Sequence, residues 1–473
     1  MTEVKVLRIG AHTAALNVDP AATQDTASMF VQRQIFQTPF ELPPGGEEVV
    51  PVLFERLEDL HNDHKTYRGK VITGAKFSDG STMEPADLFD SLQQITMIRE
   101  SAEVSLDGDA ILFSLYQPDS GFQMSLSHGS CAVCRREGET ILGTGPFQLA
   151  SDITANQVRL TRNPHYPKEL ALDEILFTVY PVDSDGRPTA LLEAVEKGEV
   201  DLTSDLARDD VRRISGVRKS FQPGNATALL FLNNESPALG DARVRRGLAH
   251  CIDRVKAAEC CYSNPLAFAA GSLLPRGLAT ASDGLGHNPR KAEELFSEAG
   301  KPERLNMLVV WGPRPYIARP QAVSEFLVEQ YAAMGITVTP RIAADSGEFV
   351  RALREEQYDL ILGGWTADTP DPWNFLDSVL HSDRIPGPSN LAVSANNGRL
   401  RSQAMDDALG RYRSERTDAE LQAVLELVDV EAPLVPLIYG SISTVSSFQV
   451  TNLMPSEMPI FSVAELDLQT RWA

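Results

Sequence analysis

Helical and extended segments alternate along the second half of the chain, and this alternation restricts the folds open to it. Helical periodicity covers four segments, at residues 241–258, 289–299, 322–334 and 346–356. Short apolar runs lie between them, at 305–310, 336–342 and 359–363. Two more helical segments, 403–414 and 418–430, precede an apolar strand at 434–439. This order predicts an α/β domain with a mainly parallel sheet.

The first half has a different, mixed pattern. Strands are expected at 4–9, 110–116, 157–162 and 172–181, and helices at 27–36 and 189–197. Residues 66–82 favour a strand closed by an Asp79-Gly80 turn, and Pro85 then begins a helix at a position where its missing N–H costs little. Two halves of different character indicate two lobes, each with its own sheet.

Length and charge narrow the classes of function. A chain of 473 residues predicts two to four domains at about 100–200 residues each, and 42% apolar residues argue against disorder. The net charge of −22 disfavours nucleic acid and anionic membrane surfaces as partners. No apolar run is long enough to predict a transmembrane segment, and the first residues have no recognisable leader.

Six short segments, taken in their order along the chain, resemble the motifs of one protein family. They are KFSDGSTMEPADLFDSL (76–92), GTGPFQL (143–149), RNPHYP (162–167), LLEAVEKGEVDL (191–202), LNNESPALGDARVRRGLAHCIDR (232–254) and DLILGGWTADTPDPWNFL (359–376). Together they resemble the solute-binding proteins of peptide and nickel ABC transporters, family 5, which include dipeptide- and oligopeptide-binding proteins. The resemblance extends over nearly the whole chain.

The resemblance implies a two-lobed α/β fold of the periplasmic-binding-protein type (type II), of the large cluster that has an extra subdomain in lobe I. Lobe I would comprise 1–233 and 446–473, with an inserted subdomain at about 45–155, and lobe II would comprise 234–445. The crossing segments would lie near 233–236 and 443–447. A ligand cleft between the lobes would close by hinge motion.

The first group of candidate site residues follows the strand at 359–363. It comprises Trp365, Thr366, Asp368, Asp371 and Trp373. Ligands of open α/β sheets bind outside the carboxyl ends of strands, which is where this segment begins. The resemblance implies that Asp368 takes the α-ammonium of a peptide, and a carboxylate suits a buried cation. The alternative is a turn-forming aspartate in a loop rich in threonine and proline.

A second candidate group, Arg314 and Tyr316, follows the strand at 305–310. The Arg-Pro-Tyr segment resembles one in dipeptide binders, where the arginine meets the peptide carboxylate, and a guanidinium suits a carboxylate in a bidentate manner. The chain continues with Ile317 and Ala318 where the family has Asn-Pro, so the match is partial. The alternative is a solvated arginine.

The cysteines and histidines do not suggest chemistry. Cys131 and Cys134 are expected on one strand and facing opposite ways, and Cys260 and Cys261 are too strained as neighbours to share a metal. We therefore expect no metal and no cofactor. The common nucleophile, phosphate-binding, zinc and dinucleotide motifs are absent from the sequence, so we predict no catalytic residue and no enzyme.

The sequence therefore predicts a monomeric protein that captures a peptide or peptide-like small molecule for uptake by an ABC permease. Removal of a leader in the natural protein would put it outside the cytoplasm, in the periplasm or at the cell surface; otherwise it would be cytoplasmic. Two alternatives remain open. One is a cytoplasmic sensor or accessory protein, which the five cysteines favour. The other is an enzyme repurposed from the same fold.

Overall fold

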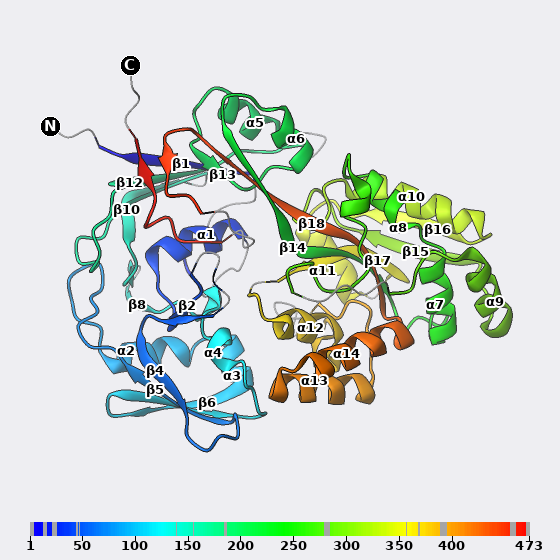
Figure 1. The fold of residues 1–473 in the computed structure, drawn as a ribbon, viewed down its shortest axis with the longest axis horizontal. Coiled ribbons are helices and arrows are strands. Elements are labelled where there is room, and N and C mark those ends of the chain that lie inside the picture. The colour runs from blue at the N-terminus through cyan, green and yellow to red at the C-terminus, as the bar shows by residue number, and fades with distance from the viewer. Residues whose placement is uncertain are drawn as a thin grey trace. The chain divides into compact units, whose positions relative to one another are not determined.

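The computed structural model describes the chain except for residues 1–3, 13–16, 21–25, 44, 45, 47, 139, 155, 184–186, 279–283, 356, 368, 388–394, 455–459 and 470–473. It divides into two compact units (Figure 1): unit 1 is Met1–Gln222 with Ile442–Ala473, and unit 2 is Pro223–Ser441. The chain passes between the units inside two long strands, β14 (Arg218–Leu232) and β18 (Leu434–Ser446). The resemblance places these passages near 233 and 446, whereas the division by internal contacts falls at 222/223 and 441/442.

The main sheet of unit 1 has the strand order β10, β11, β12, β1, β13, and β13 also pairs with the last residues of β18. These strands are β1 (Val6–Ala11), β10 (Phe147–Thr154), β11 (Gln157–Arg162), β12 (Glu174–Val179) and β13 (Leu202–Thr203). β1 and β12 run parallel, and β11 is antiparallel to both of its neighbours. Helix α1 (Thr26–Ile35) packs Phe30 into a core with Leu7 and Phe177.

A separate sheet within unit 1 occupies part of the segment expected to be an inserted subdomain. It is antiparallel, in the order β4 (Phe54–Asp59), β5 (Thr66–Val71), β7 (Ala110–Leu115), β6 (Ala102–Asp107). Its core contains Phe54, Phe113 and Phe122 in edge-on contacts. Around it lie α2 (Pro85–Leu92), α3 (Thr96–Ser101), α4 (Phe122–Ser125), η1 (Gly129–Cys131), the β8–β9 hairpin (Cys134–Glu137, Thr140–Gly143) and the β2–β3 pair (Phe40–Glu41, Val50–Pro51).

The remainder of unit 1 forms a third, smaller core. Helices α5 (Thr189–Glu196) and α6 (Arg208–Arg213) bury Leu191 and Val211 in it, together with Val445 of β18. The short strands β19 (Val450–Thr451) and β20 (Asp467–Leu468) pair near the end of the chain.

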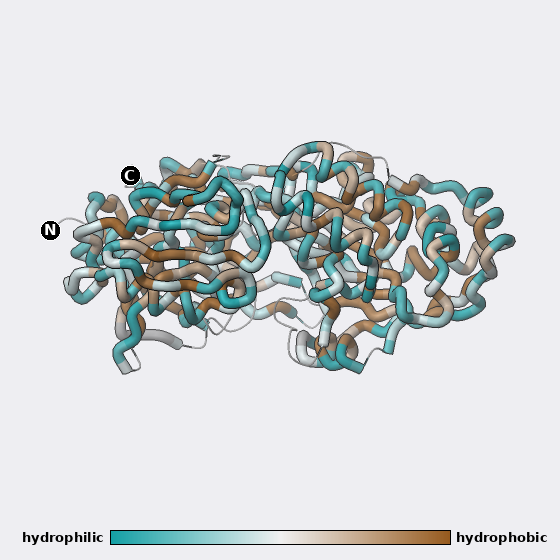
Figure 2. Tube along the Cα trace, turned by 90° about the horizontal axis from the view of Figure 1, so that it is seen from below, coloured by the Kyte–Doolittle hydropathy of each residue, from teal (hydrophilic) through white to brown (hydrophobic). Residues whose placement is uncertain are grey.

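Unit 2 has a sheet in which β17 (Leu360–Thr366), β15 (Arg304–Val309) and β16 (Thr337–Ile342) run parallel, and β14 is antiparallel to β17. Alternate residues of β14 enter two cores, Leu230 and Leu232 on one face and Leu229 and Phe231 on the other. In the hydropathy-coloured trace of Figure 2, brown apolar stretches alternate with teal hydrophilic ones along the chain.

Helices cover the two faces of this sheet. The first core includes α7 (Ala242–His250), α8 (Arg254–Glu259), α9 (Pro289–Ala299) and α10 (Pro320–Ala333), with the short η2 (Pro265–Ala267) nearby. The second includes α11 (Ser346–Arg354), α12 (Pro372–Leu380), α13 (Gln403–Glu415) and α14 (Asp418–Glu431), with η3 (Ser382–Arg384) after α12. Among the described residues, no helix is both long and apolar enough to cross a membrane.

Two expected elements are wrong in extent. The helix expected over 241–258 is two helices, because Asp253 accepts a hydrogen bond from the backbone N–H of Lys256 at 3.2 Å and begins a new one. The strand expected at 434–439 and the return strand expected at 441–450 are one continuous strand, β18, which ends at Ser446. Its polar residues Ser443, Thr444 and Ser446 are buried.

Candidate functional site

The strands β15 and β17 are parallel neighbours, so the loops that follow them begin at the same edge of the unit 2 sheet. Met307, Leu308 and Val309 of β15 pair in register with Leu360, Ile361 and Leu362 of β17. Leu360–Leu362 are fully buried, whereas Trp365 and Thr366 at the end of β17 are half-buried. The two sequence-predicted groups of site residues therefore begin at one edge of this sheet.

Tyr316 and Gly364 bring these two groups into direct contact. A Cβ atom at Gly364 would stand 2.5 Å from the Tyr316 ring and 2.5 Å from the carbonyl oxygen of Thr227 on β14. The glycine is required because a side chain would displace the ring or the neighbouring strand. Burial raises the pKa of Tyr316 to about 12, against the opposing effect of the Arg314 charge.

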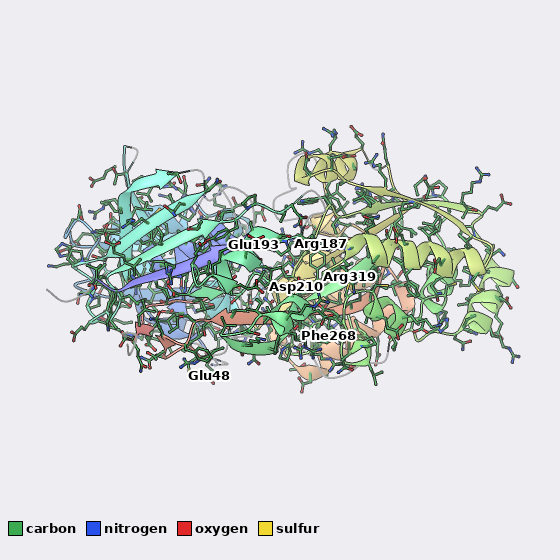
Figure 3. The ribbon with its side chains drawn as sticks, turned by 90° about the horizontal axis from the view of Figure 1, so that it is seen from above. Glu48, Arg187, Glu193, Asp210, Phe268 and Arg319 are labelled. Atoms are coloured by element: carbon green, nitrogen blue, oxygen red, sulfur yellow. The ribbon has the colours of Figure 1, made fainter. Side chains whose placement is uncertain are left out.

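Arg314 lies in a tight turn and stacks on an aromatic ring. Its backbone N–H donates to the carbonyl of Ile317 at 2.9 Å, and the N–H of Ile317 donates back at 3.0 Å. Its guanidinium lies 3.8 Å from the ring centroid of Trp311 and donates to the carbonyl of Pro313 at 2.9 Å. The loop ends at Arg319, labelled in Figure 3, directly before α10. These contacts hold the cation in place, and its binding to a ligand carboxylate stays a prediction.

Asp371 has a structural role at the start of α12. One carboxylate oxygen accepts a hydrogen bond from the backbone N–H of Trp373 at 2.9 Å and caps the helix. The other oxygen forms an ion pair with Arg416 at 3.0 Å. Asp368, the predicted ammonium anchor, lies outside the described residues.

The two tryptophans of the predicted site differ in their surroundings. Trp373 is half-buried, and the guanidinium groups of Arg413 and Arg416 lie 5.4 and 5.3 Å from its ring centroid. Two cations of the protein itself thus lie near the ring of this candidate site residue. Trp365 packs against the second core of unit 2, and its buried Nε1 has no hydrogen-bond partner in the described structure.

Sequence reasoning missed three residues at this edge, Asn225, Trp311 and Arg416. Asn225 on β14 accepts at its backbone oxygen from the N–H of Ala367 at 2.7 Å, and its side-chain amide donates to the carbonyl of Ala367 at 2.5 Å. Its contact with Ala367 spans 142 positions of the sequence, and neither residue type marks such a contact in advance. Trp311 had a signal, because it directly follows an apolar strand.

The cysteines are placed differently from the sequence expectation. Cys131 ends the 3-10 turn η1 and Cys134 begins β8, so the expectation that one strand carries both is wrong. Burial raises the pKa of Cys131 to about 12 and that of Cys261 to about 11. Within the described ranges, the structure assembles no group of three or more His, Cys, Asp or Glu side chains suited to a metal. The expectation that these cysteines bind no metal stays a prediction.

Comparisons with known proteins agree on one family. Residues 48–387 match the sequence profile described as bacterial extracellular solute-binding proteins, family 5. The chain is 27% identical over 418 residues to the peptide transport periplasmic protein SapA of Salmonella typhimurium, which covers 81% of this chain and 69% of that protein. It is 24% identical over 449 residues to the probable di/tripeptide-binding protein 5 of Pseudomonas aeruginosa, covering 84% and 83% of the two chains.

A solved structure shares the fold. The dipeptide binding protein of Pseudoalteromonas sp. SM9913, crystallised in complex with Met-Leu, superposes with a TM-score of 0.82 at 18% identity, over 98% of this chain and 100% of that one. At this identity the likeness concerns the fold, and the expected type II architecture of two α/β lobes is confirmed.

Proposed function

Because the chain belongs to the bacterial extracellular solute-binding proteins of family 5, we propose that it captures a peptide or peptide-like small molecule at the edge of unit 2 described above. The family match confirms the resemblance drawn from the six sequence segments. The relatives named above are peptide-transport or di/tripeptide-binding proteins. Their names support a peptide as the class of ligand.

The observation that carries this proposal is the meeting of two loops at one sheet edge. The turn with Arg314 and Tyr316 and the loop that carries Asp368 follow neighbouring parallel strands, and Tyr316 contacts Gly364 directly. A peptide has an ammonium group and a carboxylate. An aspartate and an arginine in these loops would give each terminus a partner of opposite charge.

The finer parts of the proposal follow from the family. We propose that the protein acts outside the cytoplasm and delivers its ligand to an ABC permease, as a monomer that binds without turnover. The location is supported by the family, which is described as one of extracellular solute-binding proteins. The position of the ligand between two lobes, which the resemblance implies, also stays a prediction.

The test is binding of defined peptides to the purified protein. Calorimetric titration with Met-Leu and Ala-Ala-Ala, each beside its N-acetylated form, should show binding of the free peptides and much weaker binding of the acetylated ones. Mass spectrometry should recover the bound peptide intact. Absence of binding to both free peptides, or their cleavage, would refute the proposal.

A further inference from the structure

We propose that Gly440 on β18 is a positioning residue for ligand binding, which sets the place of the turn that carries Arg314 and Tyr316. This inference rests on the proposed function, in which Arg314 meets the carboxylate of a peptide. A Cβ atom at Gly440 would stand 2.5 Å from the carbonyl oxygen of Pro315, in the middle of that turn. Gly440 lies outside the six segments that carry the family resemblance. Its contact with the turn is therefore visible only in the structure.

The turn rests on three neighbouring strands, β18, β14 and β17 (Figure 1). Gly440 of β18 lies against the Pro315 carbonyl, and Gly364 of β17 lies against the ring of Tyr316. β14 runs between the two glycines, and its Ala226 carbonyl is 3.2 Å from the Cβ position of Gly440. Both supports of the turn lack a side chain, so the turn approaches the strands more closely than any other residue would allow.

β18 is fixed at this point, so the turn would have to move if Gly440 were enlarged. A Cβ atom at Gly224 of β14 would stand 2.5 Å from the carbonyl carbon of Gly440, so β14 leaves β18 no room. The N–H of Tyr439 also donates to the carbonyl of Phe268 at 2.8 Å. The turn itself is closed at Arg314 by two backbone hydrogen bonds, at 2.9 and 3.0 Å, and should therefore move as one piece.

The size of the collision predicts how far the turn would move. Ordinary van der Waals contact of a Cβ atom begins at 3.4 Å, whereas the Pro315 carbonyl is at 2.5 Å. A methyl group at position 440 should push this carbonyl away by about 0.9 Å, the difference between the two distances. A binding site needs its groups within about 0.5 Å of the productive geometry. Such a shift should therefore separate Arg314 from a ligand carboxylate without removing its charge.

A glycine that contacts the same two strands at their other end in unit 2 provides the control. A Cβ atom at Gly398 would stand 2.6 Å from the carbonyl of Pro433, directly before β18, and 3.4 Å from that of Leu232, the last residue of β14. Gly398→Ala thus makes the same kind of backbone collision away from the turn. Both substitutions should lower the melting temperature, whereas only Gly440→Ala should displace the turn.

The experiment measures recognition of the peptide carboxylate. Met-Leu and Ala-Ala-Ala are titrated beside their C-terminal amides into the wild type, Gly440→Ala, Gly398→Ala, Arg314→Gln and the double variant that combines Gly440→Ala with Arg314→Gln. We expect Gly440→Ala to bind the free peptides about ten-fold more weakly, with the amides much less affected. Gly398→Ala should keep the wild-type affinities. The double variant should bind as Arg314→Gln does, because the glycine acts through the arginine.

The outcomes separate this inference from the proposed function. If the wild type binds neither free peptide, the proposed function is refuted, and the inference with it. If the wild type binds free peptides and amides alike, the carboxylate role of Arg314 and this inference are refuted, while peptide capture stands. If the wild type prefers free peptides and Gly440→Ala keeps this preference, or loses affinity for both forms alike, Gly440 has no positioning role. Full additivity of Gly440→Ala and Arg314→Gln would also overturn the inference.

Gly224→Ala decides the question if Gly440→Ala does not fold. Its methyl group would press on the backbone of Gly440 and Ser441 from β14 and displace the support of the turn. Gly224→Ala should then lose part of the preference for free peptides over amides, whereas Gly398→Ala keeps it. An unchanged preference in folded Gly224→Ala would overturn the inference.

Discussion

Two segments that carry the family resemblance, 143–149 in unit 1 and 359–376 in unit 2, contain glycines that lie close to other parts of the chain, but the parts they approach differ. In unit 1, Cβ atoms at Gly143 and Gly145 would stand 2.1 and 2.5 Å from the carbonyl oxygen of Ile35 at the end of α1. In unit 2, a Cβ at Gly364 would meet the Tyr316 ring as well as the Thr227 carbonyl. The first segment closes one piece of backbone on another, whereas the second also seats a side chain of the candidate site.

The difference teaches that a family motif is not by itself a sign of ligand contact. The 143–145 segment is held by a hydrogen bond from Gly145 to the carbonyl of Ile35 at 2.9 Å and by one from Asn163 to the carbonyl of Gly145 at 2.8 Å. These hydrogen bonds connect parts of unit 1 to each other and stabilise its fold. We therefore expect changes at 143 to alter stability and changes around 364–371 to alter affinity.

The largest expected effect is at Asp368. Asp368→Asn should weaken binding of a free peptide by about 30-fold or more, because losing one member of a buried charge pair costs about 2–5 kcal/mol. The melting temperature of the ligand-free protein should change little. Calorimetric titration beside thermal melts measures both quantities. Equal affinities of the wild type and the variant would remove this residue from the site.

Gly143→Ala should come next, with an effect on stability alone. The added methyl group would collide with backbone that a rotamer change cannot move, and overpacking of this kind costs about 1–3 kcal/mol. Urea unfolding should show the loss, while peptide affinity per folded molecule stays at the wild-type value. Gly410→Ala is the control, since no atom outside the backbone of its own helix turn lies within 4 Å of its Cβ position in α13. A weaker affinity of folded Gly143→Ala would contradict the separation of the two segments.

Gly364→Ala should combine the two effects. The methyl group would push against Thr227 of β14 and the Tyr316 ring, so we expect a stability loss of about 1–2 kcal/mol and a several-fold loss of affinity. Tyr316→Ala in the same background should recover part of the stability, because it removes one of the two obstacles, but not the affinity. Denaturant unfolding and titration of the single and double variants measure this coupling. Unchanged affinity of Gly364→Ala would place the ring outside the site.

Elements of the fold were predictable where one local signal governs them. Helix α9 begins at Pro289 and ends before Gly300, and both boundaries agree with the expected segment 289–299. The break between α7 and α8 was not predicted, because helical periodicity continues through Asp253 and only its capping bond ends it. A return strand was expected at 441–450, but its unbroken continuation from the strand at 434–439 was not, because only tertiary packing shows that its polar side chains are buried.

For the candidate site, the sequence predicted which residues follow the ends of strands and which of them have suitable side chains, but not their contacts. The sequence places Arg314 and Trp365 after two expected strands, but it does not show that these strands are neighbours or that Arg314 stacks on Trp311. Likewise, Asp371 looks like a free carboxylate until Arg416, 45 positions later, comes to lie 3.0 Å from it. Such pairings depend on the tertiary approach of α12 and α13, for which neither helix has a local signal.

The smallest expected effect is at Glu235 in unit 2, where a substitution should change stability without changing affinity for the peptide. Glu235 forms ion pairs with Arg399 and, at 2.7 Å, with Arg401. Burial alone would raise the pKa of Glu235, but the hydrogen bonds from the two arginines outweigh it and hold this pKa below the usual 4.5. A carboxylate with a lowered pKa in the folded state stabilises the protein above its unfolded pKa. That contribution is lost as the pH falls through the folded value.

Glu235→Gln should therefore reduce stability at pH 7 by about 1 kcal/mol, the range of a partly exposed ion pair. The difference from the wild type should shrink as the pH is lowered from about 5 towards 3, because the wild-type carboxylate then takes up its proton. Melting curves across this pH range measure the difference, and peptide titration at pH 7 should show unchanged affinity. A stability gap that is constant with pH would show that packing, and not charge, makes the contact favourable. A loss of affinity would show that the functional region of unit 2 extends beyond the β15–β17 edge. It would then weaken the contrast between the 143–145 segment, expected to affect stability, and the 364–371 segment, expected to affect affinity.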